Sequence, residues 1–243
     1  MRAFITSTAL LHLLFASAAL SQTSDAKPAV ARESIAIIGT GRVGGTLGKR
    51  WGALGHPIIY GSRDPDRPAV RELVAQSGND AKALRPAEAA AQASVVLFAV
   101  PWKAAEESVR SLGDVSGKIV IDVTNPLVFE GDRPVAVAVP ESGARMMQNW
   151  LRGATLVKAF NAVNWKIMEE PARAGGAVTI PIAGDAAEAK RRVARLVEEL
   201  GFEAFDVGRL GNARYLEGMA MLYVDAMVQN PPQRFEYYLR RAR

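Results

Sequence analysis

The turn at residues 39–44 is the sequence feature that most restricts how this chain can fold. It reads G-T-G-R-V-G and lies between an apolar run at residues 34–38 and a segment of helical apolar spacing that begins at Val43. In such a strand–turn–helix context, the first glycine allows the tight turn, the second lets the backbone approach a pyrophosphate, and the third lets helix and strand pack closely. Unpaired N–H groups at the helix start then bind phosphate oxygens. The pattern predicts a dinucleotide-binding turn; the alternative is a glycine-rich turn without a ligand.

Short apolar runs alternate with segments of helical periodicity along the chain. We expect strands at residues 34–38, 58–60, 94–100, 118–122, 155–160, 178–183 and 202–207. We expect helices at residues 43–54, 67–77, 86–92, 102–112, 141–151, 185–200 and 210–228. This alternation predicts the α/β class, with a Rossmann-type, doubly wound, mostly parallel sheet that has helices on both faces. No linker interrupts the pattern, so we expect one domain over residues 34–230.

Three local signals refine this expectation. Pro181 favours an edge position or an irregular end for its strand, because proline cannot donate to a strand ladder. Asp185 and Glu188 have the spacing of a capping box, which predicts that Asp185 caps the next helix. The Met and aromatic stripe in residues 210–228 is typical of a core or of a dimer face, so a homodimer is allowed.

Residues 1–21 have the pattern of a secretory signal peptide. A short positive region at Met1-Arg2 precedes an apolar stretch that is too short to span a membrane, and small residues lie before Gln22. We expect cleavage near Ser21, a linker at residues 22–33, and a periplasmic or secreted mature protein without a membrane span. The alternative is a misassigned start and a cytoplasmic protein. Residues 231–243 form a basic C-terminal tail.

Composition excludes several kinds of site. The 243 residues include no Cys and two His, which rules out a disulfide scaffold, a thiolate zinc site and a cysteine nucleophile. A Ser-His-Asp triad or a multi-histidine metal site is also disfavoured, and we interpret His56 as a structural loop residue. We therefore predict no metal ligands and no catalytic acid, base or nucleophile. The net charge of +5 favours small anionic ligands over nucleic acid.

The end of the second predicted strand indicates which dinucleotide binds. An NAD site usually places Asp or Glu there, to accept from the ribose 2′-hydroxyl. This chain has Ser62-Arg63 followed by Arg67, and a hydroxyl with guanidinium groups donates charge-assisted bonds to a 2′-phosphate. We expect Asp64 to cap the turn before Pro65 rather than to face the ribose. NADP is therefore predicted in preference to NAD; the alternative is a solvated pair of surface arginines.

Further strand ends should converge on the same crevice, because ligands of an open α/β sheet bind beyond the carboxyl ends of its strands. These ends are Val100-Pro101-Trp102, Thr124-Asn125-Pro126 and residues 158–161. The Asn125 amide is a candidate partner for the nicotinamide carboxamide. Plain turn chemistry is the alternative interpretation of each residue.

Taken together, these segments resemble the NADPH-dependent reductases of the deazaflavin coenzyme F420, a family also described by the N-terminal domain of pyrroline-5-carboxylate reductase. The similarity covers residues 34–228 and is carried by I-I-G-T-G-R-V-G, G-S-R, A-V-P, D-V-T-N-P and K-A-F-N. The residues that it places against the adenosine phosphates are Thr40, Arg42, Ser62 and Arg63. Those that it places near the nicotinamide are Val100, Pro101, Asn125 and Ala159. The ferric reductase domains of the six-transmembrane epithelial antigen proteins are also similar, which implies that the acceptor can be a flavin.

The complete predicted cofactor-binding set is Gly39, Thr40, Gly41, Arg42, Val43, Gly44, Ser62, Arg63, Arg67, Val100, Pro101, Asn125, Pro126 and Ala159. The resemblance implies hydride transfer between NADP(H) and a deazaflavin or flavin, for which the protein supplies proximity, orientation and exclusion of water. Export conflicts with an ordinary supply of NADPH. Two alternatives therefore stay open: a non-catalytic NADP-binding module, such as a redox sensor or docking subunit, and a reductase of ferric complexes through free flavin.

Overall fold

The computed structural model describes residues 32–242, apart from 79, 132, 138–140 and 229–236. The predicted signal peptide, residues 22–31 of the predicted linker, and residues 231–236 and 243 of the basic tail lie outside the described residues. The described part belongs to one contact unit, Arg32–Arg243. In that part of the chain, no helix is both long enough and apolar enough to cross a membrane.

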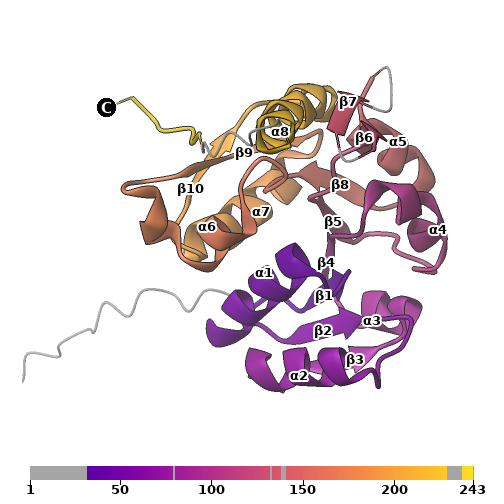
Figure 1. The fold of residues 1–243 in the computed structure, drawn as a ribbon. Coiled ribbons are helices and arrows are strands. Elements are labelled where there is room, and N and C mark those ends of the chain that lie inside the picture. Colours follow the sequence, from indigo (N-terminus) through magenta and orange to yellow (C-terminus); the bar gives the residue numbers. More distant parts are fainter. Residues whose placement is uncertain (1–31, 79, 132, 138–140, 229–236, 243) are drawn as a thin grey trace, which may run out of the picture. The chain divides into compact units, whose positions relative to one another are not determined.

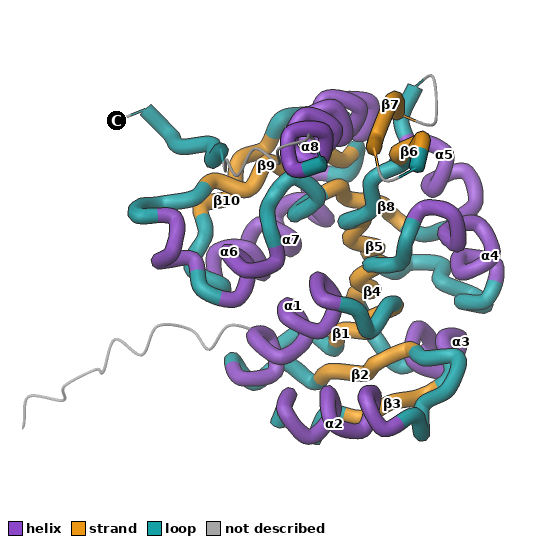
Figure 2. Tube along the Cα trace, viewed as in Figure 1, coloured by secondary structure: helices purple, strands orange, loops and turns teal. Residues whose placement is uncertain are grey.

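The strands of the main sheet follow the order β10–β9–β8–β5–β4–β1–β2–β3 (Figures 1 and 2). They are β1 (Ile35–Ile38), β2 (Ile58–Gly61), β3 (Lys82–Leu84), β4 (Val95–Phe98), β5 (Ile119–Asp122), β8 (Thr155–Lys158), β9 (Thr179–Gly184) and β10 (Glu203–Asp206). Neighbouring strands are parallel except β8 and β9, which are antiparallel. The predicted fold class, a mostly parallel Rossmann-type sheet, is confirmed.

Helices cover both faces of this sheet. They are α1 (Arg42–Ala53), α2 (Pro68–Ser77), α3 (Pro86–Ala91), α4 (Ala105–Arg110), α5 (Gly143–Trp150), α6 (Trp165–Glu169), α7 (Ala187–Glu199) and α8 (Ala213–Met227). Successive side chains of a strand point to opposite faces, so the apolar strands supply two cores. In β1, Ile35 and Ile37 pack with α1, α6 and α7, whereas Ala36 and Ile38 pack with α3, α4, α5 and α8.

The helix α1 lies unusually close to β2. A Cβ on Gly48 would overlap the hydroxyl of Tyr60, which is fully buried and hydrogen-bonded to Ser77 Oγ at 2.7 Å. Burial raises the pKa of Tyr60 to about 12, so the phenol stays neutral over the physiological range. The glycine-rich face of α1 therefore seats the helix on the sheet and fixes the position of its N-terminus.

The expectations for Pro181 and Asp185 have different outcomes. The strand β9, which contains Pro181, is not an edge strand of the sheet, because it lies between β8 and β10. Its pairing with β8 is nevertheless irregular: the pairing involves only Ala183 and Gly184, so Pro181 has no partner residue in β8. Asp185 does not cap α7: its Oδ1 accepts from the Leu210 N–H at 2.9 Å, and Oδ2 lies 3.2 Å from Arg145 Nη1. A tertiary contact thus replaces the local cap.

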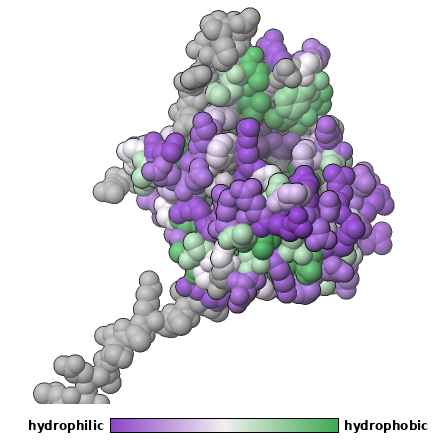
Figure 3. Space-filling model, turned by 60° about the horizontal axis from the view of Figure 1, so that its bottom comes forward, coloured by the Kyte–Doolittle hydropathy of each residue, from purple (hydrophilic) through white to green (hydrophobic). Residues whose placement is uncertain are grey.

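Several elements were not expected from the sequence. These include β3, α6, a two-stranded antiparallel hairpin of β6 (Leu127–Glu130) and β7 (Arg133–Val137), and a 3₁₀ turn at Trp102–Ala104. The hairpin follows β5 and contacts α8. On the face drawn in Figure 3, hydrophilic residues cover most of the surface and hydrophobic residues form smaller patches.

Candidate functional site

A cleft of about 930 Å³ lies at the carboxyl ends of β1, β2, β4 and β5. Its walls are the turn between β1 and α1, the turn after β2, the segment from β4 to α4, and the residues after β5. The sheet order makes these four strand ends neighbours. Segments that are far apart in the sequence therefore meet in one crevice, as expected for the ligand site of an open α/β sheet.

Each glycine of the G-x-G-x-x-G turn meets a different steric condition. A Cβ on Gly39, whose φ is +109°, would overlap the Ala99 carbonyl oxygen. A Cβ on Gly44 would overlap the Gly39 carbonyl oxygen and lie 3.0 Å from Ile37 Cγ2. A Cβ on Gly41 would meet no atom within 4 Å. The first and third glycines therefore allow close packing, whereas Gly41 leaves open space in front of the helix.

The N-terminus of α1 has no side-chain cap. Gly41 is the residue before the helix, and the first turn contains no acidic side chain. The N–H groups of a first helical turn lack intrahelical partners, and their partial positive charge favours an anion. The open space at Gly41 and these uncapped amides fit the pyrophosphate of a dinucleotide.

The turn after β2 is held by Ser62. Its hydroxyl donates to the Asp64 carbonyl at 2.8 Å and accepts from the Asp64 N–H at 3.2 Å. The expectation that Asp64 caps this turn is therefore wrong. The Asp64 carboxylate lines the cleft and is exposed, and within the described ranges no group hydrogen-bonds to it.

Four arginines border the cleft: Arg42, Arg63, Arg67 and Arg85. Arg67 Nη2 donates to Thr40 Oγ1 at 3.3 Å, and Arg85 Nη1 donates to the Arg63 carbonyl. The guanidinium carbon of Arg42 lies 5.7 Å from the ring centroid of Trp165. Among the described residues, none of the four guanidinium groups has a carboxylate oxygen within 4.0 Å. Within the described residues, these four positive charges at the cleft are therefore free of ion pairs.

The loop after β5 is fixed by a pair of amides. Asn125 Nδ2 donates to the Asn161 carbonyl at 2.9 Å, and Asn125 Oδ1 accepts from Asn161 Nδ2 at 2.9 Å. Asn161 Nδ2 also donates to the Leu216 carbonyl at 2.8 Å. Asn125 lines the cleft, but a nicotinamide carboxamide would have to share an amide that already holds this loop in place.

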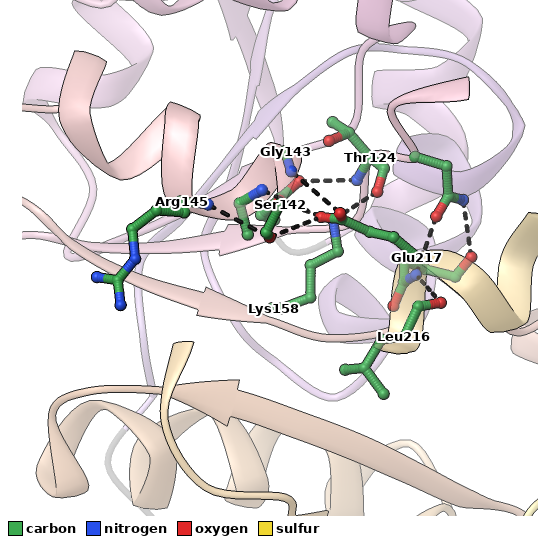
Figure 4. Close-up of polar contacts among 11 residues, drawn as sticks. Thr124, Ser142, Gly143, Arg145, Lys158, Leu216 and Glu217 are labelled. Atoms are coloured by element: carbon green, nitrogen blue, oxygen red, sulfur yellow. Dashed lines mark hydrogen bonds and ion pairs between the residues drawn. The ribbon is translucent and has the colours of Figure 1, made fainter. Parts of the chain in front are cut away.

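A buried charged cluster lies behind the same loop (Figure 4). Lys158 Nζ lies 2.8 Å from Asp122 Oδ2 and 3.2 Å from Glu217 Oε1, and all three side chains are fully buried. Lys158 also donates to the Thr124 carbonyl at 2.6 Å. One ammonium group therefore pairs with a carboxyl group from β5 and with one from α8, and it also binds the backbone of the cleft wall.

The Glu217 carboxylate has a second role at the start of α5. It accepts from the N–H groups of Gly143 and Ala144, at 3.0 and 3.1 Å, and from the Ser142 hydroxyl at 3.2 Å (Figure 4). A carboxylate at a helix N-terminus is favoured by the helix dipole. These bonds explain how a buried acid is tolerated and tie α8 to α5.

Thr124 carries the only buried side-chain nitrogen or oxygen without a hydrogen-bond partner in the described part of the chain, its Oγ1. The residue lines the cleft, and its own backbone N–H donates to Asp122 Oδ1 at 2.8 Å. Buried hydroxyls are normally paired. An unpaired hydroxyl in the cleft wall fits a site whose polar contacts are completed by a bound molecule.

Most of the predicted cofactor-binding residues meet in this cleft. Those that line it are Gly39, Thr40, Gly41, Arg42, Val43, Ser62, Arg63, Arg67, Val100, Pro101 and Asn125. Gly44 lies beneath the turn, Pro126 is buried against Gly143, and Ala159 is fully buried in the core. These three residues lie outside the lining of the cleft, so contacts of Pro126 and Ala159 with the cofactor stay predictions.

The structure adds residues that sequence reasoning missed. The largest of these are Arg85 and Trp165; α4 contributes Glu107 and Ser108, and Ser111 follows α4. Trp102, which was expected next to the cofactor together with Val100 and Pro101, lines the cleft. It stacks on Trp150, with ring centroids 5.6 Å apart and an interplanar angle of 27°. The position of Arg85 depends on the pairing of β2 with β3, for which the sequence carries no periodic signal.

His56 lies apart from the cleft, in the segment that precedes β2. It is 1% exposed, its Nδ1 accepts from the Glu33 N–H at 3.0 Å, and its Nε2 lies 2.7 Å from Glu199 Oε2. These contacts agree with its interpretation as a structural residue.

Comparison with protein families finds a match over residues 34–126 to the family described as NADP oxidoreductase, coenzyme F420-dependent. The F420-dependent NADP reductase of Methanothermobacter thermautotrophicus is 29% identical over 217 residues, which cover 81% of this chain and 90% of the relative. A solved structure of a candidate F420-dependent NADP reductase from Arthrobacter sp. FB24 is 28% identical. It superposes with a TM-score of 0.77 and covers 86% of this chain and 100% of its own.

A second kind of relative is much longer. The rat metalloreductase STEAP3 is 28% identical over 194 residues, which cover 77% of this chain. The chain spans 36% of the length of that relative, so the similarity concerns one part of the metalloreductase.

Proposed function

We propose that this chain, which is similar to the coenzyme F420-dependent NADP oxidoreductases, transfers hydride between NADP(H) in the cleft and a deazaflavin or flavin acceptor. The observation that carries the choice of NADP is the edge of the cleft after β2. There, Ser62, Arg63 and Arg67 gather around a position where an NAD site usually carries a carboxylate. The guanidinium groups have no acidic partner among the described residues, and a 2′-phosphate supplies one.

The chain's own residues bind and orient the dinucleotide. The first N–H groups of α1 and the Arg42 guanidinium would hold the pyrophosphate, and Ser62, Arg63 and Arg67 the 2′-phosphate. Val100 and Pro101 would form the apolar wall at the nicotinamide end. When bound, the nicotinamide ring supplies the hydride.

The chemistry requires little else from the protein. Direct hydride transfer depends on distance and orientation of two rings and on exclusion of water, so no general acid or base is needed. The two carboxylates that line the cleft, Asp64 and Glu107, lie in the turn after β2 and in α4. The buried Lys158 cluster acts through the Thr124 carbonyl, which fixes the wall near the reacting ring.

The acceptor is the finer part of the proposal. The relatives named as F420-dependent favour a deazaflavin, and the metalloreductase similarity favours a flavin or, through free flavin, a ferric complex. Titration of purified protein with NADPH, followed by oxidation of NADPH in the presence of F420, FMN, FAD or ferric citrate with free flavin, tests these options. Turnover with F420 alone supports the deazaflavin, and turnover with FMN or FAD supports the flavin. Tight NADPH binding without turnover on any acceptor would contradict the proposal and support a non-catalytic binding module.

We also propose that the protein is exported, with cleavage near Ser21, on the sequence pattern of residues 1–21. N-terminal sequencing of the protein purified from its host tests this. A mature chain that begins near Gln22 supports export, and a chain that begins at residues 1 or 2 contradicts it.

A further inference from the structure

We propose that Arg85 is a further specificity-determining residue of the cleft, and that its guanidinium contacts the 2′-phosphate of the dinucleotide. This inference rests on the proposed function. Arg85 comes directly after β3 and before α3, on a segment that the sequence pattern does not connect with the glycine turn. It nevertheless lines the same cleft as Ser62, Arg63 and Arg67.

Strand pairing brings Arg85 to the turn after β2. Gly61 is in register with Leu84, and the Ser62 N–H donates to the Leu84 carbonyl at 2.9 Å. Arg85, the residue directly after β3, therefore comes next to the turn that begins at Ser62. The hydrogen bond from Arg85 Nη1 to the Arg63 carbonyl shows that the guanidinium reaches across this turn.

The remaining donors of Arg85 make no hydrogen bond to the described residues. A guanidinium has five N–H donors, and Arg85 makes one side-chain hydrogen bond with described residues, to Arg63. The nearest acid in the sequence, Glu88, uses its Oε2 to accept from the Arg85 backbone N–H at 3.2 Å and forms no ion pair with the guanidinium. Donors are therefore left for a ligand.

Arginines elsewhere on this surface do find carboxylates. Arg110 lies 2.6 Å from Glu106, and Arg192 lies 2.7 Å from Glu33. In the described part of the chain, Arg63, Arg67 and Arg85 share one edge of the cleft without any such partner. Bringing like charges together is unfavourable unless an anion compensates them. A phosphate dianion next to Ser62 compensates three guanidinium groups at once, whereas a ribose hydroxyl does not.

Binding measurements on three variants test this role. We expect Arg85→Gln to weaken NADPH and 2′,5′-ADP about tenfold, as for a lost hydrogen bond to a charged group, and to leave NADH and ADP unchanged. Arg85→Lys keeps the charge and should retain most of the preference for NADPH. Arg71→Gln removes one exposed positive charge from α2, outside the cleft lining, and should change none of these affinities.

The outcomes separate three explanations. Equal weakening of NADPH and NADH by Arg85→Gln would show that Arg85 only supports the turn, and would overturn the inference. Unchanged affinity of Arg85→Gln for all four ligands would also overturn the inference. So would an equal loss of NADPH affinity in Arg71→Gln, because it would indicate a long-range electrostatic effect rather than a contact of Arg85. If the wild-type protein binds neither NADPH nor 2′,5′-ADP, the proposed function itself fails.

Discussion

Arg67 donates a hydrogen bond of 3.3 Å from Nη2 to the hydroxyl of Thr40, so the segment before α2 touches the turn after β1. The bond joins the two places where a dinucleotide would be held by its pyrophosphate and by its 2′-phosphate. Both side chains line the cleft, and the bond is exposed. A ligand can therefore recruit this guanidinium at small cost.

The first prediction concerns Arg67. Because its contact is exposed, Arg67→Ala should change the free energy of unfolding by no more than about 0.5 kcal/mol. It should weaken NADPH binding by about 1.5–3 kcal/mol, as for a lost charged hydrogen bond. Urea unfolding and calorimetric titration measure the two effects. As a control, Thr40→Val removes the internal partner and should leave the preference for NADPH over NADH intact.

Arg63 should discriminate between the two nucleotides. We expect Arg63→Ala to weaken NADPH binding by about 1.5–3 kcal/mol and NADH binding hardly at all, because only NADPH carries the 2′-phosphate. Dissociation constants for both nucleotides measure the difference. Equal losses would contradict the assignment of Arg63.

The glycines of the turn should separate stability from binding. In Gly44→Ala, the new methyl group overlaps the Gly39 carbonyl oxygen, which should lower the free energy of unfolding by about 1–3 kcal/mol, as in overpacked cores. In Gly41→Ala, the methyl group enters open space, so stability should hold while nucleotide binding falls. Thermal unfolding and nucleotide titration of both variants test this pair. A Gly41→Ala protein that binds NADPH normally would show that the pyrophosphate does not approach this turn.

Acid pH should weaken the fold through Glu33. Its carboxylate accepts two bonds from Arg192, at 2.8 and 2.7 Å, and the Arg192 guanidinium holds the pKa of Glu33 below its usual range, against the opposing effect of partial burial. A carboxyl group whose folded pKa is lowered stabilises the protein above its unfolded pKa, about 4.3, and loses that contribution as pH falls through the folded value. We expect Glu33→Gln to be less stable than wild type at neutral pH, with the difference in urea midpoint shrinking as pH falls below about 4.3 and disappearing below the folded pKa of Glu33. If Glu33→Gln remains less stable than wild type at acid pH, the loss of stability comes from altered packing and not from the charge of Glu33.

The buried lysine should be essential for folding. Lys158→Met leaves the carboxylates of Asp122 and Glu217 buried without a cation, which should cost about 3–5 kcal/mol of unfolding free energy. Lys118→Met, in which the lost ammonium is partly exposed and bonded to two carbonyl groups, serves as the control. A loss of under about 1 kcal/mol in Lys158→Met would contradict the role of the cluster.

The parts of this fold that depend on residues close together in the sequence could be predicted. The strand at Ile35–Ile38, the glycines after it and the helix that follows form one local unit, in which spacing alone specifies the steric needs. The sheet order then follows from the limited ways in which such units pack. Both the fold class and the position of the cleft were accessible for this reason.

The misses concern contacts between distant segments. Asp185 is drawn from its expected cap to the Leu210 N–H, and Arg85 reaches Arg63 through strand pairing. Ala159, which was expected near the nicotinamide, is buried in the core. These outcomes depend on which face a residue presents and on partners that only the tertiary structure supplies.

The pairing of Asp122 with Lys158, and of Asn125 with Asn161, has a consequence for dissecting the molecule. Both first partners lie within residues 34–126, the segment that the family comparison matches, and both second partners lie beyond it. A fragment cut at residue 126 would retain the carboxylate of Asp122, which is buried in the whole protein, without its partner Lys158. The smallest autonomous unit of this protein must extend through α8, where Glu217 completes the same cluster.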